Sequence, residues 1–138
     1  MNSWPKPFIP VLIDHDLPPL KIIDSSAGLI NFAESKEFRM YVCGITPYDA
    51  THLGHAATYL AFDLIYRYQS LSGRNVKFVE NITDVDDPLL ERANRDKLDW
   101  SELADSQINL FKSDMSALRV IPPDHFIKVT ESLSIIEG

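Results

Sequence analysis

Two histidines lie three residues apart in His52-Leu53-Gly54-His55, at the start of a stretch whose apolar residues keep helical spacing. Side chains three apart at a helix start project from one face, beside backbone N–H groups without helical partners. Those donors and the helix dipole favour an anion. Gly54 has no side chain to keep a nucleotide away. The arrangement suits attack on a nucleoside triphosphate, because fixed donors stabilise negative charge that builds on phosphorus oxygens.

The same histidine pair has simpler interpretations. Histidines near a helix start also cap the helix, lie satisfied in a core or bind a metal ion. The spacing of the two histidines does not distinguish these interpretations. The surrounding sequence is therefore needed to decide between them.

The elements around the histidines form one supersecondary unit. Residues 38–43 and 76–79 are β-prone and apolar and predict two strands, and residues 52–71 between them predict a helix. Such a βαβ unit has parallel strands and a right-handed crossover. Ligands of an open parallel sheet lie beyond the carboxyl ends of its strands. We therefore expect segments 43–55 and 81–87 to converge on one site.

The rest of the chain predicts one arm and further short elements. They are an extended, proline-rich arm over residues 1–19 with His15 facing solvent, a short strand over 20–23, helices beginning at 86–88 and at Asp99, and helical turns over 130–136. We expect the arm and a single domain over residues 20–138.

Composition narrows the functional class. The chain of 138 residues is 45% hydrophobic and 24% charged, as in ordinary globular proteins, and no apolar run approaches a membrane span. No apolar signal segment follows the amino terminus, so we expect a cytoplasmic protein. A net charge of −7 and a pI near 4.9 argue against a nucleic-acid partner. The single cysteine, Cys43, allows no internal disulfide.

A long segment carries a family resemblance. Residues 40–56, MYVCGITPYDATHLGHA, resemble the signature of the class I synthetases, with residues 52–55 in place of their HIGH motif. A cysteine after the first strand, together with residues 81–87 after the second, resembles the cysteine-specific branch. That branch contains cysteinyl-tRNA synthetase and the cysteine ligases of mycothiol biosynthesis.

Several features resemble the ligases more closely. They are Ile45-Thr46-Pro47-Tyr48 in place of Pro-Thr-Val-Tyr, Ala57 in place of arginine, Asp87-Pro88-Leu89-Leu90, and an arm that contains Ser3-Trp4 and Pro10-Val11-Leu12. The resemblance extends over nearly the whole chain.

The resemblance implies an α/β fold, namely the amino-terminal part of a Rossmann-like nucleotide-binding domain with parallel strands and crossover helices. It implies that cysteine attacks ATP, which carries Mg²⁺, to give cysteinyl-adenylate, and that the amine of glucosaminyl-inositol then displaces AMP. His52 and His55 would be catalytic and contact the phosphates. The residues that would bind ATP or the adenylate are Cys43, Gly44, Ile45, Thr46, Gly54, Thr58, Asn81, Ile82 and Thr83.

The resemblance also implies that Cys43 is a zinc ligand whose metal takes the substrate thiolate, which zinc binds better than a hydroxyl. The alternative is a small buried residue at a strand end. A zinc site needs about three protein ligands, and the chain has no second cysteine and no KMSKS-type lysine loop. We therefore expect a fragment with an incomplete zinc site, which a downstream polypeptide would complete.

Three alternatives stay open on the sequence. Asp84, Asp86 and Asp87 could bind magnesium, although a helix cap before Pro88 explains part of this cluster. The chain could be a fragment of a cysteinyl-tRNA synthetase. It could also be a non-catalytic binding module that keeps an adenylate pocket.

Overall fold

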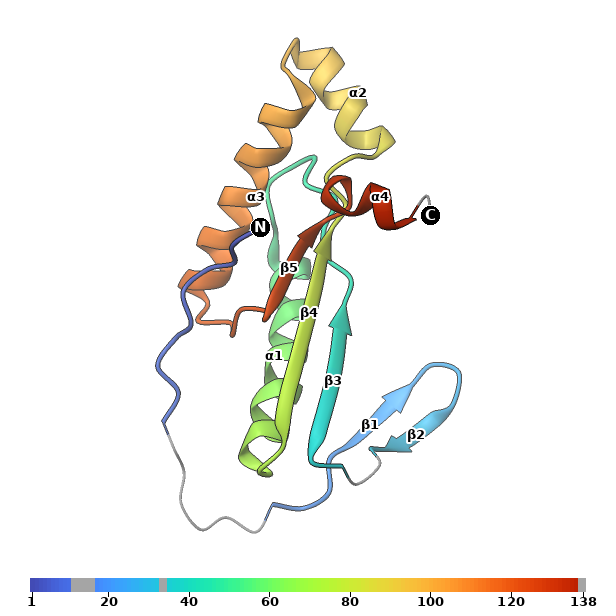
Figure 1. Cartoon of the computed structure of the whole chain (residues 1–138), viewed down its shortest axis with the longest axis vertical. Helices are drawn as coiled ribbons and strands as arrows, with labels where there is room; N and C mark the ends of the chain where they lie inside the picture. The colour runs from blue at the N-terminus through green and yellow to red at the C-terminus, as the bar shows by residue number, and fades with distance from the viewer. Residues whose placement is uncertain (11–16, 33–34, 137–138) are drawn as a thin grey trace.

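A computed structural model of the chain describes residues 1–10, 17–32 and 35–136 (Figure 1). Its elements in chain order are β1 (Lys21–Asp24), β2 (Gly28–Asn31), β3 (Glu37–Val42), α1 (Leu53–Leu71), β4 (Asn75–Ile82), α2 (Asp87–Asp96), α3 (Trp100–Ala117), β5 (His125–Lys128), the 3₁₀ turn η1 (Thr130–Ser132) and α4 (Leu133–Ile136). No helix among the described residues is long and apolar enough to cross a membrane.

The main sheet is parallel and has the order β3-β4-β5. Helix α1 connects β3 to β4, and α2 with α3 connects β4 to β5 (Figure 1). In β4 every second residue is buried, including Phe78 and Ile82. This alternation aims one face of the strand at the helices. The predicted α/β architecture, with parallel strands and crossover helices, is confirmed.

The core lies between this face of the sheet and helices α1 and α3. Phe111 of α3 is fully buried and packs against Tyr59 of α1 and Phe126 of β5. Trp4 enters the same cluster, with its ring edge-to-face against Phe111 and Phe126, and its indole N–H donates to the Val120 carbonyl at 2.8 Å. The amino-terminal residues are therefore attached to the core.

Part of the predicted arm cannot be compared with the structure. Residues 11–16, which include Val11, Leu12 and His15, lie outside the described residues. The division into an arm over 1–19 and a domain over 20–138 stays a prediction.

Two strands have no counterpart among the predicted elements, and one is longer than predicted. Strand β2 forms an antiparallel hairpin with β1, and its residues are mostly exposed, so it shows no alternating pattern. Strand β5 has four residues and one buried side chain, Phe126. Both exist because a neighbouring strand supplies their hydrogen bonds. Strand β4 extends over Asn75–Ile82, beyond the predicted 76–79, because β3 and β5 pair along it.

The predicted helix starts agree with the structure. Asp86 is the N-cap of α2, and Asp99 is the N-cap of α3, where its carboxylate accepts from the Ser101 and Glu102 amides. The predicted turns over 130–136 are present as η1 and α4. These signals are local in sequence and therefore survive in the fold.

Candidate active site

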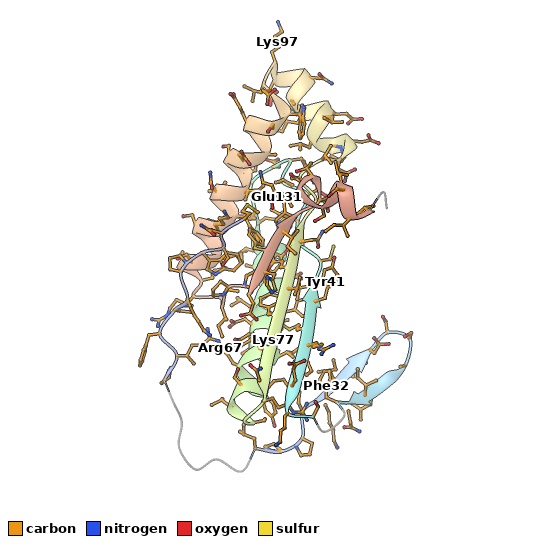
Figure 2. The ribbon with its side chains drawn as sticks, viewed as in Figure 1. Phe32, Tyr41, Arg67, Lys77, Lys97 and Glu131 are labelled. Carbon is orange, nitrogen blue, oxygen red and sulfur yellow. The ribbon has the colours of Figure 1, made fainter. Side chains whose placement is uncertain are left out.

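The carboxyl ends of β3 and β4 are joined by side-chain and backbone hydrogen bonds. The Asn81 side-chain oxygen accepts from the Gly44 amide at 3.1 Å and from the Tyr41 hydroxyl at 2.8 Å. Tyr41 lies near the end of β3 in Figure 2. The Thr83 amide donates to the Ile45 carbonyl at 3.1 Å. The structure thus brings together the two segments that the sequence expected to converge.

Gly44 is where the two strand ends come closest. A Cβ atom at this position would lie 1.6 Å from the Asn81 carbonyl oxygen and 2.8 Å from its carbon. No side chain fits there without moving backbone. The glycine therefore sets the spacing of the two strand ends that carry the site.

The two histidines cap helix α1 reciprocally. His52 is the N-cap, and its Nδ1 accepts from the Gly54 amide at 3.0 Å. The His52 amide in turn donates to Nδ1 of His55 at 3.2 Å. The ring centroids lie 4.1 Å apart. The capping interpretation of the pair is therefore correct, and two backbone donors that the sequence argument left to an anion are used by the imidazoles.

Capping determines which ring nitrogens remain. A neutral imidazole that accepts at Nδ1 carries its proton on Nε2. Both rings accept at Nδ1, so each has an Nε2–H donor that the cap does not use. Burial, and after it the neighbouring His52, lower the pKa of His55 below its ordinary value. For His55, the neutral form that capping requires is thus also favoured by its surroundings.

Gly54 has a role in this cap. A Cβ atom there would lie 2.8 Å from Cε1 and 2.9 Å from Nδ1 of His52. A side chain would push the imidazole away from its capping position. The sequence predicted only that Gly54 leaves room for a nucleotide. The structure shows that the capping position of the His52 ring requires a glycine here.

The remaining predicted binding residues differ in whether their side chains are accessible to a ligand. Thr58 on α1 donates to the Gly54 carbonyl at 3.1 Å, and Thr46 donates to the Asp86 carboxylate at 3.3 Å. Both hydroxyl oxygens can still accept a bond. Ile45 and Ile82 belong to the core, and Ile82 is fully buried. Their side chains could touch a ligand only if the core opened, so they would contribute through backbone atoms.

Cys43 directly follows β3 and is exposed, which excludes the alternative of a buried core residue. Its carbonyl accepts from the Tyr59 hydroxyl at 3.3 Å. Within the described part of the chain, no three His, Cys, Asp or Glu side chains are placed to hold a metal ion. The residues present therefore do not make a zinc site by themselves, and Cys43 as a zinc ligand stays a prediction.

The aspartates after β4 have structural partners. Asp84 is buried and accepts from the Thr130 amide at 3.0 Å and from the Thr130 hydroxyl. Asp86 accepts from the Asp87 amide at 2.9 Å as the N-cap of α2. These contacts support the capping interpretation of the cluster over the magnesium one.

Space for a ligand is present beside His52, whereas His55, Cys43 and Gly44 do not line it. An open cavity of about 420 Å³ borders His52 and Ala56 of α1, and its opposite wall includes Asp114 and Met115 of α3. Asp114 also accepts a bond from the Thr51 hydroxyl. The cavity wall contributed by α3 had no signal in the sequence, because it depends on how the two helices pack.

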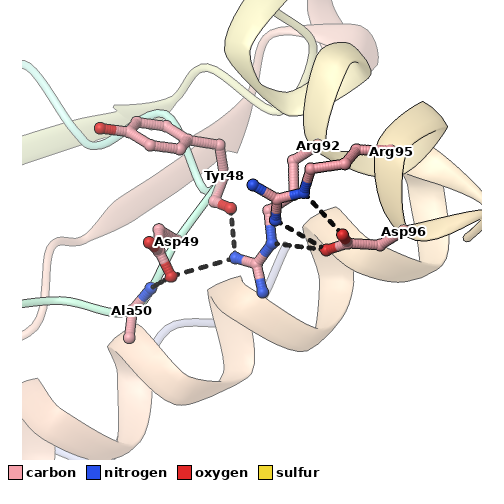
Figure 3. Close-up of polar contacts among 6 residues, drawn as sticks. All are labelled: Tyr48, Asp49, Ala50, Arg92, Arg95 and Asp96. Atoms are coloured by element: carbon pink, nitrogen blue, oxygen red, sulfur yellow. Dashed lines mark hydrogen bonds and ion pairs between the residues drawn. The ribbon is translucent and has the colours of Figure 1, made fainter.

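Two residues near the site were missed by sequence reasoning. Arg92 of α2 contacts the loop before His52 (Figure 3), and only the packing of α2 brings it there. Glu80 of β4 is fully buried, and neither carboxylate oxygen has a hydrogen-bond partner among the described residues. Burial raises the pKa of Glu80 to about 8. The alternation of β4 could have revealed Glu80, since it occupies an inward position between Phe78 and Ile82.

Comparison with known proteins yields closely similar sequences. The L-cysteine:1D-myo-inositol 2-amino-2-deoxy-alpha-D-glucopyranoside ligase of Thermomonospora curvata is 53% identical over 141 residues, which cover 99% of this chain and 34% of that protein. The ligase of the same name from Segniliparus rotundus is 56% identical over 137 residues, covering 99% of this chain and 32% of that protein. The chain thus spans about a third of the length of these curated relatives.

A solved structure and a family model agree with the fold. Mycobacterium tuberculosis methionyl-tRNA synthetase, in complex with methionyl-adenylate, has a TM-score of 0.63 and 27% identity, over 70% of this chain and 19% of that one. Residues 29–138 match the family described as tRNA synthetases class I (C) catalytic domain. Since the match takes in most of the sequence, this chain belongs to the class I tRNA synthetase catalytic-domain family and has its Rossmann-like fold.

Proposed function

We propose that this chain provides the nucleotide-binding part of an ATP-dependent cysteine ligase that forms cysteinyl-adenylate and joins cysteine to glucosaminyl-inositol in mycothiol biosynthesis. Relatives at 53% and 56% identity that are named as L-cysteine:1D-myo-inositol 2-amino-2-deoxy-alpha-D-glucopyranoside ligases support these substrates. The observation that carries the chemistry is the reciprocal cap of His52 and His55, at the start of the helix that follows the carboxyl end of β3.

In the first step, the cysteine carboxylate attacks the α-phosphorus of ATP, and the bond to the leaving pyrophosphate breaks. Negative charge grows on the phosphate oxygens as this happens. The Nε2–H groups of His52 and His55 are the donors that this chain offers to those oxygens. Losing one preorganised donor typically lowers kcat by roughly a hundredfold to a thousandfold.

The cap explains why these donors are preorganised. A backbone hydrogen bond at Nδ1 holds each ring. The tautomer and the rotamer of each histidine are therefore already fixed before ATP binds. A donor fixed in this way costs no reorganisation at the moment of reaction. The two neutral rings, 4.1 Å apart, can approach one anion without the mutual repulsion of two imidazolium ions.

In the second step, the amine of glucosaminyl-inositol attacks the carbonyl carbon of cysteinyl-adenylate. The amide bond forms, the acyl–phosphate bond breaks, AMP leaves, and the amine releases a proton. The exposed position of Cys43 beside Gly44 leaves the strand end open to the amino acid. Zinc at Cys43 would require ligands beyond the described residues, so no part of this sequence of steps depends on it.

Two other functions remain candidates. A cysteinyl-tRNA synthetase fragment is favoured by the match of residues 29–138 to the class I (C) tRNA synthetase catalytic domain, whereas the net charge of −7 works against a large tRNA footprint. The other candidate is a binding module without turnover, which the same two Nε2–H donors would serve.

Pyrophosphate exchange tests the proposal. The 138-residue chain is incubated with ATP, Mg²⁺ and labelled pyrophosphate, with cysteine, serine or no amino acid. Cysteine-dependent exchange, followed by cysteine transfer to glucosaminyl-inositol and not to tRNA, is the expected result when a downstream polypeptide that completes the domain is added to the chain. Transfer to tRNA alone would establish the synthetase alternative.

A binding measurement completes the test. Titration calorimetry with a non-hydrolysable cysteinyl-adenylate analogue distinguishes a chain that binds the adenylate without catalysing exchange from a chain that does not bind it. Binding without exchange would support the binding module, and neither binding nor exchange would contradict the proposal for this chain.

A further inference from the structure

The loop before the histidine pair comprises residues 43–51. Its first half, residues 43–47, includes buried side chains, and its second half, residues 48–51, is mostly exposed. In the first half, Ile45 is buried and its carbonyl is bonded to the Thr83 amide, and Pro47 is fully buried. In the second half, Tyr48 and Asp49 are exposed. Burial cannot fix this second half, although His52 follows it directly.

Arg92 of α2 makes the contacts that hold the exposed half. Its Nη1 donates to the Tyr48 carbonyl and to Oδ1 of Asp49, the latter at 3.1 Å (Figure 3). The same Asp49 oxygen accepts from the Ala50 amide at 2.8 Å. One guanidinium nitrogen therefore fixes the Tyr48 carbonyl directly and the Ala50 amide through Asp49. His52 lies two residues further along the chain.

The guanidinium is itself held in place. Its Nε donates to Asp96, four residues on in the same helix, at 3.5 Å, and its side chain is 25% exposed. Asp96 is also paired with Arg95, whose side chain is 72% exposed. A partly buried guanidinium that contacts both a carbonyl and a carboxylate is more restricted than an exposed ion pair, which contributes little.

Two further contacts hold the same loop from the connection between β4 and β5. The Thr46 hydroxyl donates to Asp86, the N-cap of α2, and the Thr51 hydroxyl donates to Asp114 of α3. Arg92 lies between these two points along the loop. Without Arg92, the hydrogen bond from the Tyr48 amide to the Thr46 carbonyl at 2.9 Å would remain, but the contacts from α2 to the Tyr48 carbonyl and to Asp49 would be lost.

We propose that Arg92 is a positioning residue for the candidate active site. Through the Tyr48 carbonyl and the Asp49 carboxylate, it sets the path of the loop so that His52 reaches the N-cap of α1 and both imidazoles present their Nε2–H donors together. What those donors bind rests on the proposed function, but the effect of Arg92 on the two rings does not.

The test observes the rings themselves. Long-range proton–nitrogen NMR spectra of the imidazoles report the tautomer of each histidine in the 138-residue chain. We expect Nε2–H signals for His52 and His55 in the wild type and averaged tautomers in Arg92→Ala. His125, on β5, is an internal reference that should not change. ATP affinity, measured in the same samples, should fall roughly tenfold.

Three matched variants separate positioning from a general structural role. Arg95→Ala removes an arginine of the same helix that pairs with Asp96 and makes no hydrogen bond or ion pair with the loop in the described part of the chain, so the rings should keep their tautomers. Asp96→Asn should change the rings less than Arg92→Ala does, because the loop contacts come from Nη1 and the asparagine oxygen can still accept from Nε. Arg92→Lys should restore part of the signal, since its ammonium can reach one of the two acceptors.

Unchanged ring signals in folded Arg92→Ala would overturn the proposal, as would an equal change in Arg95→Ala. If Arg92→Ala does not fold, Asp49→Asn weakens the same contact from the loop side, and unchanged rings there would overturn it equally. A wild-type chain that binds no ATP but whose rings respond to Arg92→Ala would contradict the proposed function and leave the positioning role supported.

Discussion

His52 combines two tasks in one side chain, because its Nδ1 caps the helix while its Nε2–H remains as a donor. Cap and donor can be separated by substitution. Asparagine is a strong N-cap but lacks the imidazole donor.

We expect His52→Ala to lower the free energy of unfolding by about 1 kcal/mol through loss of the cap, and to weaken ATP binding. His52→Asn should recover most of the stability without recovering ATP affinity. Urea unfolding and calorimetric titration with ATP measure the two effects. An asparagine variant that binds ATP like the wild type would show that the ring is only a cap.

At the same scale, Gly44 is set by a backbone contact. Gly44→Ala would place a Cβ atom 1.6 Å from the Asn81 carbonyl oxygen, so we expect a loss of about 3 kcal/mol or more in unfolding free energy. Gly28→Ala is the comparison, since that site is open but has a φ of +71°, which costs about 1–2 kcal/mol. Equal losses in urea unfolding would contradict the close approach of β3 and β4.

Among the elements, the amino-terminal segment has its most buried contact with the core at Trp4, beside polar contacts of Met1, Ser3 and Phe8. Trp4 is buried against Phe111 and Phe126 and bonded to the Val120 carbonyl. We expect Trp4→Ala to cost about 3–5 kcal/mol, and Trp4→Phe, which keeps a ring but removes the donor, to cost about 1–3 kcal/mol. The midpoints of urea unfolding report both. A neutral Trp4→Ala would mean that the segment does not stabilise the core.

The starts of the helices and strands show which elements local sequence can predict. Asp86 before Pro88 and Asp99 before Glu102 predicted the starts of α2 and α3 correctly, because an N-cap acts within one turn. Strand β5 had no such signal. Its four residues pair with β4 only after α2 and α3 have returned the chain to the sheet.

For the whole molecule, the buried Glu80 carboxyl links stability to pH. Burial raises its pKa from 4.5 to about 8 in the folded state, so the folded protein holds this proton at pH values where the unfolded chain has released it. The stability that goes with protonation is full below pH 4.5 and is lost as pH rises towards 8.

We therefore expect Glu80→Gln, which stays neutral, to gain stability relative to the wild type as pH rises from 5 to 8. Urea unfolding at several pH values in this window measures the difference between the two proteins. Glu91→Gln, at an exposed position of α2, should show no such trend. A constant difference between Glu80→Gln and wild type across the window would contradict an uncompensated buried carboxyl.

The sequence by itself determined the βαβ unit, the cap-forming aspartates and the convergence of residues 43–55 with 81–87, because these follow from local spacing and from the rule that parallel strands end at one edge. Tertiary structure alone decided that Arg92 reaches the loop before His52 and that Glu80 has no partner among the described residues. Such hydrogen-bond partners depend on how segments far apart in the sequence pack against each other. Residue spacing along the chain therefore does not predict which acceptor a side chain will contact.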